Sequence, residues 1–260
     1  MLSENPIGKP FTILSEVSST NNYAMQQVQA HLAAHGEAWF ALHQKAGKGQ
    51  RGKGWKDEPG KNILLSIVIE PNTISIDNQF LLTVVVSLGC FDFMTKYAID
   101  QTSIKWPNDI YWRDRKAGGI LIENIIQGKD WKYSIVGIGI NINQTFFSPD
   151  LPNPVSLKQI TGKTFEATEL GVELCSFIEK RWQQLQNKNQ QSTLLKEYES
   201  YLYKLHEKVT FKIGEAIVEA KVIGVNESGQ LLIDTGEVVP GNFGTVEWMF
   251  SHTIATPDNI

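Results

Sequence analysis

The chain has 260 residues, and its 24 Lys and Arg against 28 Asp and Glu give a formal net charge of −4. With 42% hydrophobic and 20% charged residues, the composition excludes a disordered or collagen-like chain, and the net acidity argues against broad nucleic-acid binding. No uninterrupted apolar run reaches about 18 residues, so no transmembrane helix is predicted; the first residues lack a secretory pattern, and two cysteines in apolar contexts, Cys90 and Cys175, indicate buried thiols and a cytoplasmic location.

The first half of the chain carries signals of both helix and strand. Ser19-Thr20-Asn21 are small polar residues that can cap a helix, which is predicted to run to about Ala34 and to end at Gly36. The segment 80–97 contains three consecutive valines, but its length without a turn signal favours a buried helix over a strand. Strands are predicted at 38–44, 62–69, 103–106, 110–112, 119–127 and 132–142, with a loop at 45–61. Tight turns between neighbouring strands indicate a mostly antiparallel sheet.

The second half begins with a connection rich in Pro, Ser and Asn at 143–161, followed by helices at 168–187 and 193–205. From about His206 the apolar residues alternate with period two, which predicts short strands at 209–213, 217–225, 231–233 and 238–239. The fold class is therefore α+β. A larger domain is predicted over 1–205 and a small SH3-like β-barrel over 206–260.

A glycine-rich segment is the first candidate site. Residues 45–61 carry a net charge of +4, which leaves −8 on the rest of the chain. Its members are Gly47, Lys48, Gly49, Gln50, Arg51, Gly52, Lys53, Gly54 and Trp55. Glycines allow close backbone approach, and the cations make a local anion site. The segment fails as a dinucleotide fingerprint because no helix follows, and as a Walker loop because Gly54 replaces the hydroxyl residue; a flexible surface loop is the competing interpretation.

Three further segments follow. K-W-P-N-D at 105–109 places a cation, an amide and a carboxylate at a strand end, and K-A-G-G-I-L-I-E at 116–123 leads a lysine into an apolar strand. G-I-G-I-N at 137–141 puts glycines inside a strand, which indicates close backbone approach or a bulge. Taken alone, each of the first two segments could be a charged hairpin end, and the third is more simply explained as a bulge without a ligand.

Together with S-T-N at 19–21, these segments in this order resemble the biotin protein ligase family, and K-W-P-N-D followed by K-x-G-G-I-L-x-E carries most of the specificity. The resemblance covers nearly the whole chain. It implies a class II synthetase-like α+β fold and an ATP-dependent biotin–[acetyl-CoA-carboxylase] ligase, which makes biotinyl-5′-AMP from biotin and MgATP. Biotin is then transferred to a lysine of a biotin carboxyl carrier domain.

The resemblance also implies residue roles. Biotin would be bound by Ser19, Thr20, Asn21, Gln44, Gly47, Lys48, Gly49, Gln50 and Lys116. ATP and the adenylate would be bound by Arg51, Lys53, Trp55, Asn108, Lys116 and Asn141. The catalytic residues would be Lys105, Asp109, Lys116 and Arg51, with no resident metal. Gln50 departs from the family's usual G-R-G-R-x-G-R form and removes one cation, which bears on the strength of adenylate retention; Arg51, Lys53 and Lys116 could compensate.

Other interpretations remain open. A lipoate-type protein ligase would share the adenylate chemistry, a catalytically weak biotin-binding module would share the site, and a nucleic-acid-binding role would depend on the charge of residues 45–61 alone. His31 and His35 have the spacing of a metal pair, but Leu32 stands where a glutamate would be needed and no third ligand is evident. Because 18 residues before Ser19 are too few for a DNA-binding domain, no repressor role is expected, and the protein is predicted to be a monomer or a homodimer.

Overall fold

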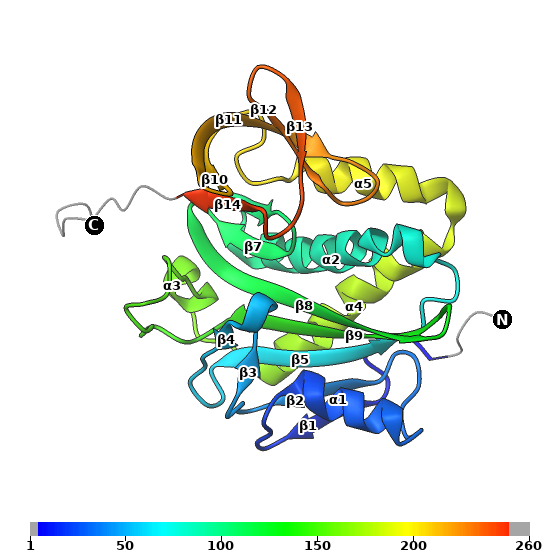
Figure 1. Ribbon diagram of the computed structural model, residues 1–260. Helices are drawn as coiled ribbons and strands as arrows, with labels where there is room; N and C mark the ends of the chain where they lie inside the picture. Colours follow the sequence, from blue (N-terminus) through cyan, green and yellow to red (C-terminus); the bar gives the residue numbers. More distant parts are fainter. Residues whose placement is uncertain (1–4, 250–260) are drawn as a thin grey trace. The chain divides into compact units, whose positions relative to one another are not determined.

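The computed structural model describes residues 5–249, and the chain divides into two compact units between Tyr203 and Lys204 (Figure 1). The larger unit contains a seven-stranded sheet, called the main sheet, with the order β1-β2-β5-β9-β8-β7-β6. Its strands are β1 (Phe11–Leu14), β2 (Ala38–Ala41), β5 (Asn62–Ile69), β6 (Thr102–Lys105), β7 (Asp109–Trp112), β8 (Arg115–Gln127) and β9 (Asp130–Asn141). Only the β1–β2 pair is parallel among these neighbours, so the predicted mostly antiparallel sheet is confirmed.

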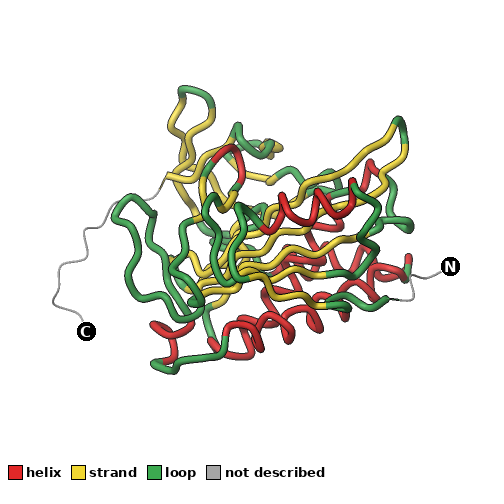
Figure 2. The backbone as a smooth tube through the Cα atoms, turned by 90° about the horizontal axis from the view of Figure 1, so that it is seen from below, coloured by secondary structure: helices red, strands yellow, loops and turns green. Residues whose placement is uncertain are grey.

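Helices pack along the main sheet and on one another (Figure 2). They are α1 (Thr20–Gln29), α2 (Phe80–Ala98), α3 (Leu157–Thr161), α4 (Ala167–Gln186) and α5 (Gln191–Ser200), with single 3₁₀ turns at Gln50–Gly52, Ile76–Asn78 and Lys188–Gln190. Helix α4 lies close to the sheet, because a Cβ atom at Gly171 would lie 2.8 Å from the Phe40 ring. Arg181 of α4 joins two other helices through ion pairs with Asp92 of α2 at 2.6 Å and Glu197 of α5 at 2.7 Å.

The predicted helix at 80–97 is confirmed as α2. The stretch Ile76–Ala98 is long and apolar enough to cross a membrane by length and composition, but 67% of its most apolar window is buried in the protein. Polar residues such as Thr83, Ser87 and Asp92 interrupt the apolar run in sequence, which is why counting an unbroken run did not find it. Burial on this scale is typical of the core helix of a layered α+β unit.

Several element boundaries differ from the prediction. Helix α1 ends at Gln29 instead of Ala34, because His31 takes a left-handed φ of 57° and the Leu32 and His31 amides bond to Gln27 and Val28 carbonyls in a Schellman motif. His31 and His35 are therefore not on one helix. Strand β1 and helix α3 were not predicted; α3 begins with a capping box, in which the Ser156 side chain accepts from the Gln159 amide at 3.3 Å.

The smaller unit contains a five-stranded sheet with the order β13-β12-β11-β10-β14. The strands are β10 (Lys208–Ile213), β11 (Ala216–Val225), β12 (Leu231–Asp234), β13 (Val238–Gly241) and β14 (Val246–Met249), all paired antiparallel. Strand β14 was not predicted. The SH3-like closure of this unit and the division of roles between 1–205 and 206–260 stay predictions.

Candidate active site

Residues of several predicted site segments lie on one face of the main sheet. Residues directly opposite in neighbouring strands point to the same face, and the faces alternate along each strand. Gly137 of β9 lies opposite both Ser66 of β5 and Leu121 of β8, while Gly139 lies opposite Gly119. These five positions therefore share a face, and the segments around them build a continuous surface above strands β5, β9 and β8.

A β-bulge brings Lys116 to this same face. Asp109 of β7 lies opposite Gly119, but Tyr111 lies opposite Lys116, so that Ala117 is the extra residue of β8. In a regular strand, Lys116 would point to the opposite face from Gly119, because the two residues are three positions apart. The bulge re-aims the lysine, and its Nζ reaches Asp109 Oδ1 at 2.7 Å.

Lys105, Asp109 and Lys116 form the charged cluster of the site. Lys105 lies opposite Asp109 in the β6–β7 hairpin, and its Nζ is 3.4 Å from the Tyr111 hydroxyl. Burial lowers the pKa of Lys105 to about 8; Asp109 opposes this shift, whereas Lys116 and Lys53 add to it. The cluster can therefore supply positive charge beside a carboxylate in a partly desolvated place.

Asn108 and Asn141, predicted to contact the adenylate, bond to the backbone around this cluster. The Asn108 side-chain amide donates to the Ile120 carbonyl. The Asn141 amide donates to the Val155 carbonyl at 3.2 Å, and the Val155 N–H donates to the Lys116 carbonyl at 2.9 Å. Both asparagines thus support the segments that hold Lys116 and Asp109, and direct adenylate contacts stay a prediction.

A second group, called the polar cluster, consists of Thr20, Asn21, Gln44 and Ser66. Gln44 Oε1 accepts from the Thr20 N–H at 2.7 Å and from the Thr20 hydroxyl at 3.1 Å. The Ser66 hydroxyl lies 2.7 Å from that of Thr20 and 2.6 Å from Asn21 Oδ1. Ser19 is buried beside them and makes no side-chain capping bond. The predicted biotin-binding residues of α1 and Gln44 therefore come together, and Ser66 is a member that sequence analysis missed.

The two glycines of G-I-G-I-N allow close approach. A Cβ atom at Gly137 would lie 2.2 Å from Asn21 Oδ1, and one at Gly139 would lie 2.7 Å from the Trp55 ring. The β8–β9 register is continuous at both positions, so they are not bulges. Trp55 thus lies over β9 next to the charged cluster, and its buried indole N–H has no hydrogen-bond acceptor among residues 5–249.

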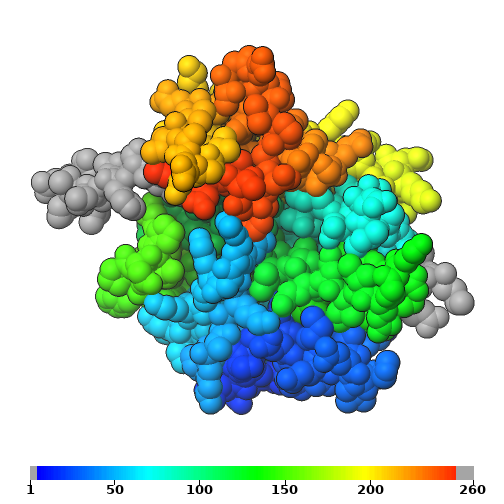
Figure 3. Space-filling view, in the orientation of Figure 1, coloured from blue at the N-terminus to red at the C-terminus, as the bar shows by residue number. Residues whose placement is uncertain are grey.

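The glycine-rich segment folds into a short hairpin. Strands β3 (Gly47–Lys48) and β4 (Gly54–Trp55) pair antiparallel around the 3₁₀ turn, where Arg51 takes a left-handed φ of 56°. This refines the predicted loop at 45–61. The hairpin lies on the surface, where its atoms are the sky-blue ones in Figure 3, and with Leu121 and Glu123 it lines a pocket of about 580 Å³. Gln50 does not line that pocket.

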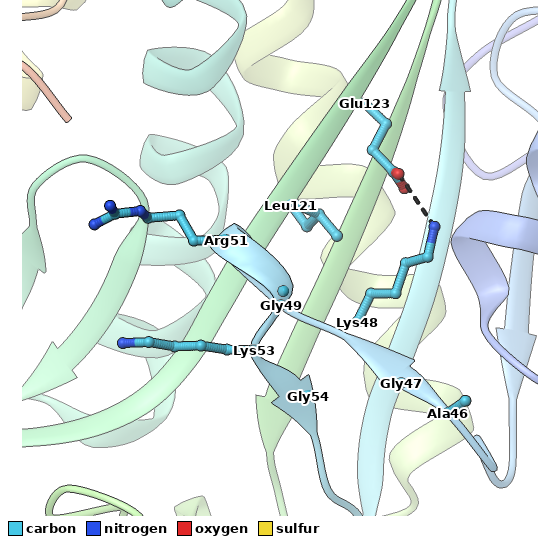
Figure 4. Close-up of a pocket in the computed structure, with 10 residues that line it drawn as sticks. Ala46, Gly47, Lys48, Gly49, Arg51, Lys53, Gly54, Leu121 and Glu123 are labelled. Atoms are coloured by element: carbon cyan, nitrogen blue, oxygen red, sulfur yellow. Dashed lines mark hydrogen bonds and ion pairs between the residues drawn. The ribbon is translucent and has the colours of Figure 1, made fainter. Parts of the chain in front are cut away.

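The three cations of the hairpin point in two directions (Figure 4). Lys48 turns toward β8, where its Nζ lies 3.3 Å from Glu123 Oε1, while Arg51 and Lys53 extend side by side to the other side of the hairpin. Lys53 contributes to the lowered pKa of Lys105, so its charge acts on the charged cluster. The hairpin therefore faces both clusters of the site.

Sequence analysis also missed Glu123 as a site residue, although it ends the K-A-G-G-I-L-I-E motif. Its Oε2 accepts from the Asn21 side-chain amide at 2.8 Å. A signal was available in the sequence. Gly119, Leu121 and Glu123 are alternate residues of a predicted strand, so they share one face, and Glu123 is the acidic residue among them. Ser66 could have been found as a lone hydroxyl in the apolar run 62–69.

Comparison with known proteins agrees with this arrangement. The model of the Biotin/lipoate A/B protein ligase family matches residues 14–141. The bifunctional ligase/repressor BirA of Bacillus subtilis is 26% identical over 230 residues, which cover 86% of this chain and 70% of that protein. The biotin--[acetyl-CoA-carboxylase] ligase of Paracoccus denitrificans is 26% identical over 228 residues, which cover 85% of this chain and 92% of that protein.

A solved structure gives the same result. The biotin protein ligase of Aquifex aeolicus in complex with biotin and ATP matches with a TM-score of 0.78 and 26% identity, over 94% of this chain and 100% of that chain. The match extends over the described α+β fold, including the main sheet that carries the two clusters. Residues 14–141 therefore belong to the Biotin/lipoate A/B protein ligase family, and over most of its length the chain is similar to biotin protein ligases.

Proposed function

We propose that this chain is an ATP-dependent biotin protein ligase that forms biotinyl-5′-AMP and then transfers biotin to a lysine of a carrier domain. The observation that carries the proposal is the placement of a neutral polar cluster and a charged cluster on one sheet face, with a cationic hairpin beside them. The neutral ring of biotin needs the uncharged polar cluster, and the anionic phosphate of ATP needs the cations of the charged cluster and the hairpin. The similarity to the two ligases named above supports biotin and ATP as the substrates of these two environments.

In the first half-reaction, a biotin carboxylate oxygen attacks the α-phosphorus of MgATP, and the bond to the β-phosphate breaks to release pyrophosphate. The protein has to align the two reactants and to stabilise the negative charge that develops on phosphorus. Lys116, Arg51 and Lys53 supply that charge. Asp109 holds Lys116 at 2.7 Å, and the bulge at Ala117 keeps its side chain on the reactive face. Mg²⁺ enters as part of the ATP substrate.

In the second half-reaction, a neutral lysine amine attacks the acyl carbon of the mixed anhydride, and the bond to the AMP oxygen breaks. The amine must lose a proton, and Asp109 is the carboxylate of the charged cluster. Asp109 acts either as the base or as the group that orients the amine. Asp109→Asn separates these roles, because an amide can orient an amine but cannot take its proton.

The polar cluster binds the ureido ring of biotin in this proposal. Gln44 uses Oε1 for Thr20, so its amide N–H groups are turned away, toward the space beside Gly47. They can donate to a ring acceptor there. Trp55, with its buried indole N–H, lies on the other side of the hairpin base and would contact the adenine.

The carrier substrates, assembly and location are also proposals. Biotin carboxyl carrier domains of biotin-dependent carboxylases are the expected protein substrates, by analogy with the ligase of Paracoccus denitrificans. We expect a monomer or homodimer in the cytoplasm without a DNA-binding role. Buried Cys90, whose pKa is raised by burial, is consistent with a thiol that stays reduced there.

The decisive test is incubation with biotin, MgATP and a carrier domain, followed by mass measurement of the carrier. A gain of one biotinyl group at a single lysine, with one pyrophosphate released per transfer, is the expected result. Lipoate in place of biotin is the comparison arm: preferential lipoyl transfer would instead indicate a lipoate-type ligase. Biotin binding without pyrophosphate release would identify a binding module.

A further inference from the structure

Glu123 joins the cationic hairpin to the polar cluster. Its two carboxylate oxygens serve different partners: Oε2 accepts from the Asn21 amide at 2.8 Å, and Oε1 accepts from Lys48 Nζ at 3.3 Å. The Glu123 side chain is 31% exposed and that of Lys48 is 41% exposed. Both line the pocket. The Glu123 carboxylate therefore contacts both Asn21 of the polar cluster and Lys48 of the hairpin. Figure 4 shows the contact with Lys48.

The bond to Glu123 fixes which way the Asn21 amide faces. Asn21 Nδ2 donates to Glu123 and also lies 3.3 Å from the Leu121 carbonyl, so the amide oxygen must face the Ser66 hydroxyl. Because Ser66 also meets Thr20, which in turn bonds to Gln44, the orientation extends through the whole polar cluster. Glu123 therefore sets the hydrogen-bonding pattern that a ligand ring would meet.

The second bond acts on the hairpin. A segment with four glycines loses much conformational entropy when it closes, and a half-exposed ion pair offsets only part of that loss. The Lys48–Glu123 pair therefore biases the hairpin toward the closed position without locking it. Arg51 and Lys53 point to the other side, so Lys48 is the hairpin cation committed to this contact.

We propose that Glu123 is a positioning residue that latches the hairpin through Lys48 while it orients Asn21, so that ring recognition and retention of the acyl-adenylate are coupled. The proposal rests on the function proposed above. When the latch opens, water can attack the acyl carbon, and the bond to the AMP oxygen breaks to give biotin and AMP without transfer. The latch should therefore control how much adenylate is lost for each biotin transferred.

Two substitutions break the ion pair between Lys48 and Glu123 and keep an acceptor oxygen at position 123 for the Asn21 amide. Lys48→Met removes the cation. Glu123→Gln keeps one acceptor oxygen for Asn21 and places an amide N–H₂ toward Lys48, which cannot form the ion pair. Glu123→Ala removes both contacts and should also raise the KM for biotin. Lys56→Met is the matched control, because Lys56 forms an exposed ion pair with Asp150 at 3.2 Å near the hairpin but does not line the pocket.

The measurement is the ratio of AMP released by hydrolysis to biotin transferred, with the full chain, biotin, MgATP and a carrier domain. Lys48→Met and Glu123→Gln should each raise this ratio about two- to five-fold, and the double variant should raise it no further. Lys56→Met should match the wild type. A ratio unchanged in either single variant, or equal additive increases in the double variant, would overturn the latch.

A ligand-free measurement keeps this test separate from the test of the function. Amide hydrogen exchange over residues 47–54 should be about two- to five-fold faster in Lys48→Met and Glu123→Gln than in the wild type and in Lys56→Met. If the wild type released no pyrophosphate with biotin and ATP, the proposed function would fail while exchange still decided the latch. Equal exchange in all four proteins overturns the latch even where the wild type is an active ligase.

Discussion

The polar cluster and the charged cluster lie on the same face of the main sheet but are built on opposite principles. Thr20, Asn21, Gln44 and Ser66 are at most 9% exposed, carry no charge and bond to one another. In the charged cluster, the Lys116 and Asp109 side chains are 31% and 25% exposed. Lys105 is kept partly desolvated, with a pKa lowered to about 8.

The difference follows from what each cluster has to do. A neutral ring is recognised by fixed donors and acceptors, and these are least ambiguous when each group is already bonded to a neighbour. Charge that develops on a phosphate is stabilised by cations that are not fully neutralised, and holding such cations in a partly buried place costs stability. The polar cluster should therefore contribute to both stability and binding, whereas the charged cluster should contribute to activity at the expense of stability.

The largest expected effect is on catalysis by the charged cluster. Lys116→Met should lower the rate of biotinyl-AMP formation about 10²- to 10³-fold, the range seen when one preorganised donor to a developing negative charge is removed. The melting temperature should change little, since the lysine is partly exposed. Biotin-dependent pyrophosphate exchange measures the rate, and thermal unfolding is the control; an exchange rate near that of the wild type would remove Lys116 from its proposed role.

Replacing Lys105 should raise the stability of the protein but lower its activity. Its pKa is lowered from 10.5 to about 8, so the folded state binds fewer protons than the unfolded state between these values, and stability rises with pH across that window. At pH 7 the buried ammonium therefore costs up to about 3 kcal/mol. Lys105→Met should raise the free energy of unfolding by up to that amount and slow adenylation.

The pH profile separates the charge of Lys105 from its packing. Since the ammonium form stabilises phosphate charge, adenylation by the wild type should fall as the pH rises through about 8. Lys105→Arg keeps its charge throughout this range and should extend activity to higher pH. An identical alkaline limb in the two proteins would show that another group titrates.

The charged cluster also shows how far sequence could lead. Lys105 and Asp109 lie four residues apart across a hairpin, so their proximity follows from the predicted strands. The position of Lys116 does not, because it depends on the bulge at Ala117, and two consecutive glycines in the motif give no unique place for an extra residue. The order of the segments predicted the site, but the face on which its main lysine lies required the structure.

In the polar cluster, sequence analysis predicted the members that stand in polar segments and missed those embedded in strands. Ser66 lies in a run of apolar residues, and Glu123 ends an apolar motif, so neither was named as a site residue. The glycines 137 and 139 were recognised as close approaches or bulges. The continuous strand register and the contacts with Asn21 and Trp55 decide for close approach. Sequence analysis could not show these contacts, because they join segments more than 80 residues apart in the sequence.

These two glycines test the separation of the clusters. Gly137→Ala would place a Cβ atom 2.2 Å from Asn21 Oδ1, which must move and break its bonds to Ser66 and Glu123. We expect a loss of about 1–3 kcal/mol in stability and a KM for biotin raised more than that for ATP. Gly139→Ala pushes on the Trp55 ring and should raise the KM for ATP more. The same ratio of KM changes in both variants would show that the clusters bind one ligand group.

The smallest expected effect is on stability at acidic pH, and it arises outside both clusters. His35 is buried, and its Nδ1 accepts from the Glu70 N–H at 3.1 Å, so the neutral ring is the bonded form. Burial lowers the pKa of His35, against opposing effects of Glu70 and Glu179. The folded state therefore binds fewer protons than the unfolded state, and the contribution of His35 is complete above about pH 6.5 and is lost as the pH falls below it. The free energy of unfolding should decrease by at most about 1.4 kcal/mol per pH unit there.

His35→Asn retains an acceptor without a titrating ring and should flatten the slope of the free energy of unfolding between pH 7.5 and 5, measured by urea unfolding. An unchanged slope in His35→Asn would show that other titrating groups of the chain determine the acid sensitivity.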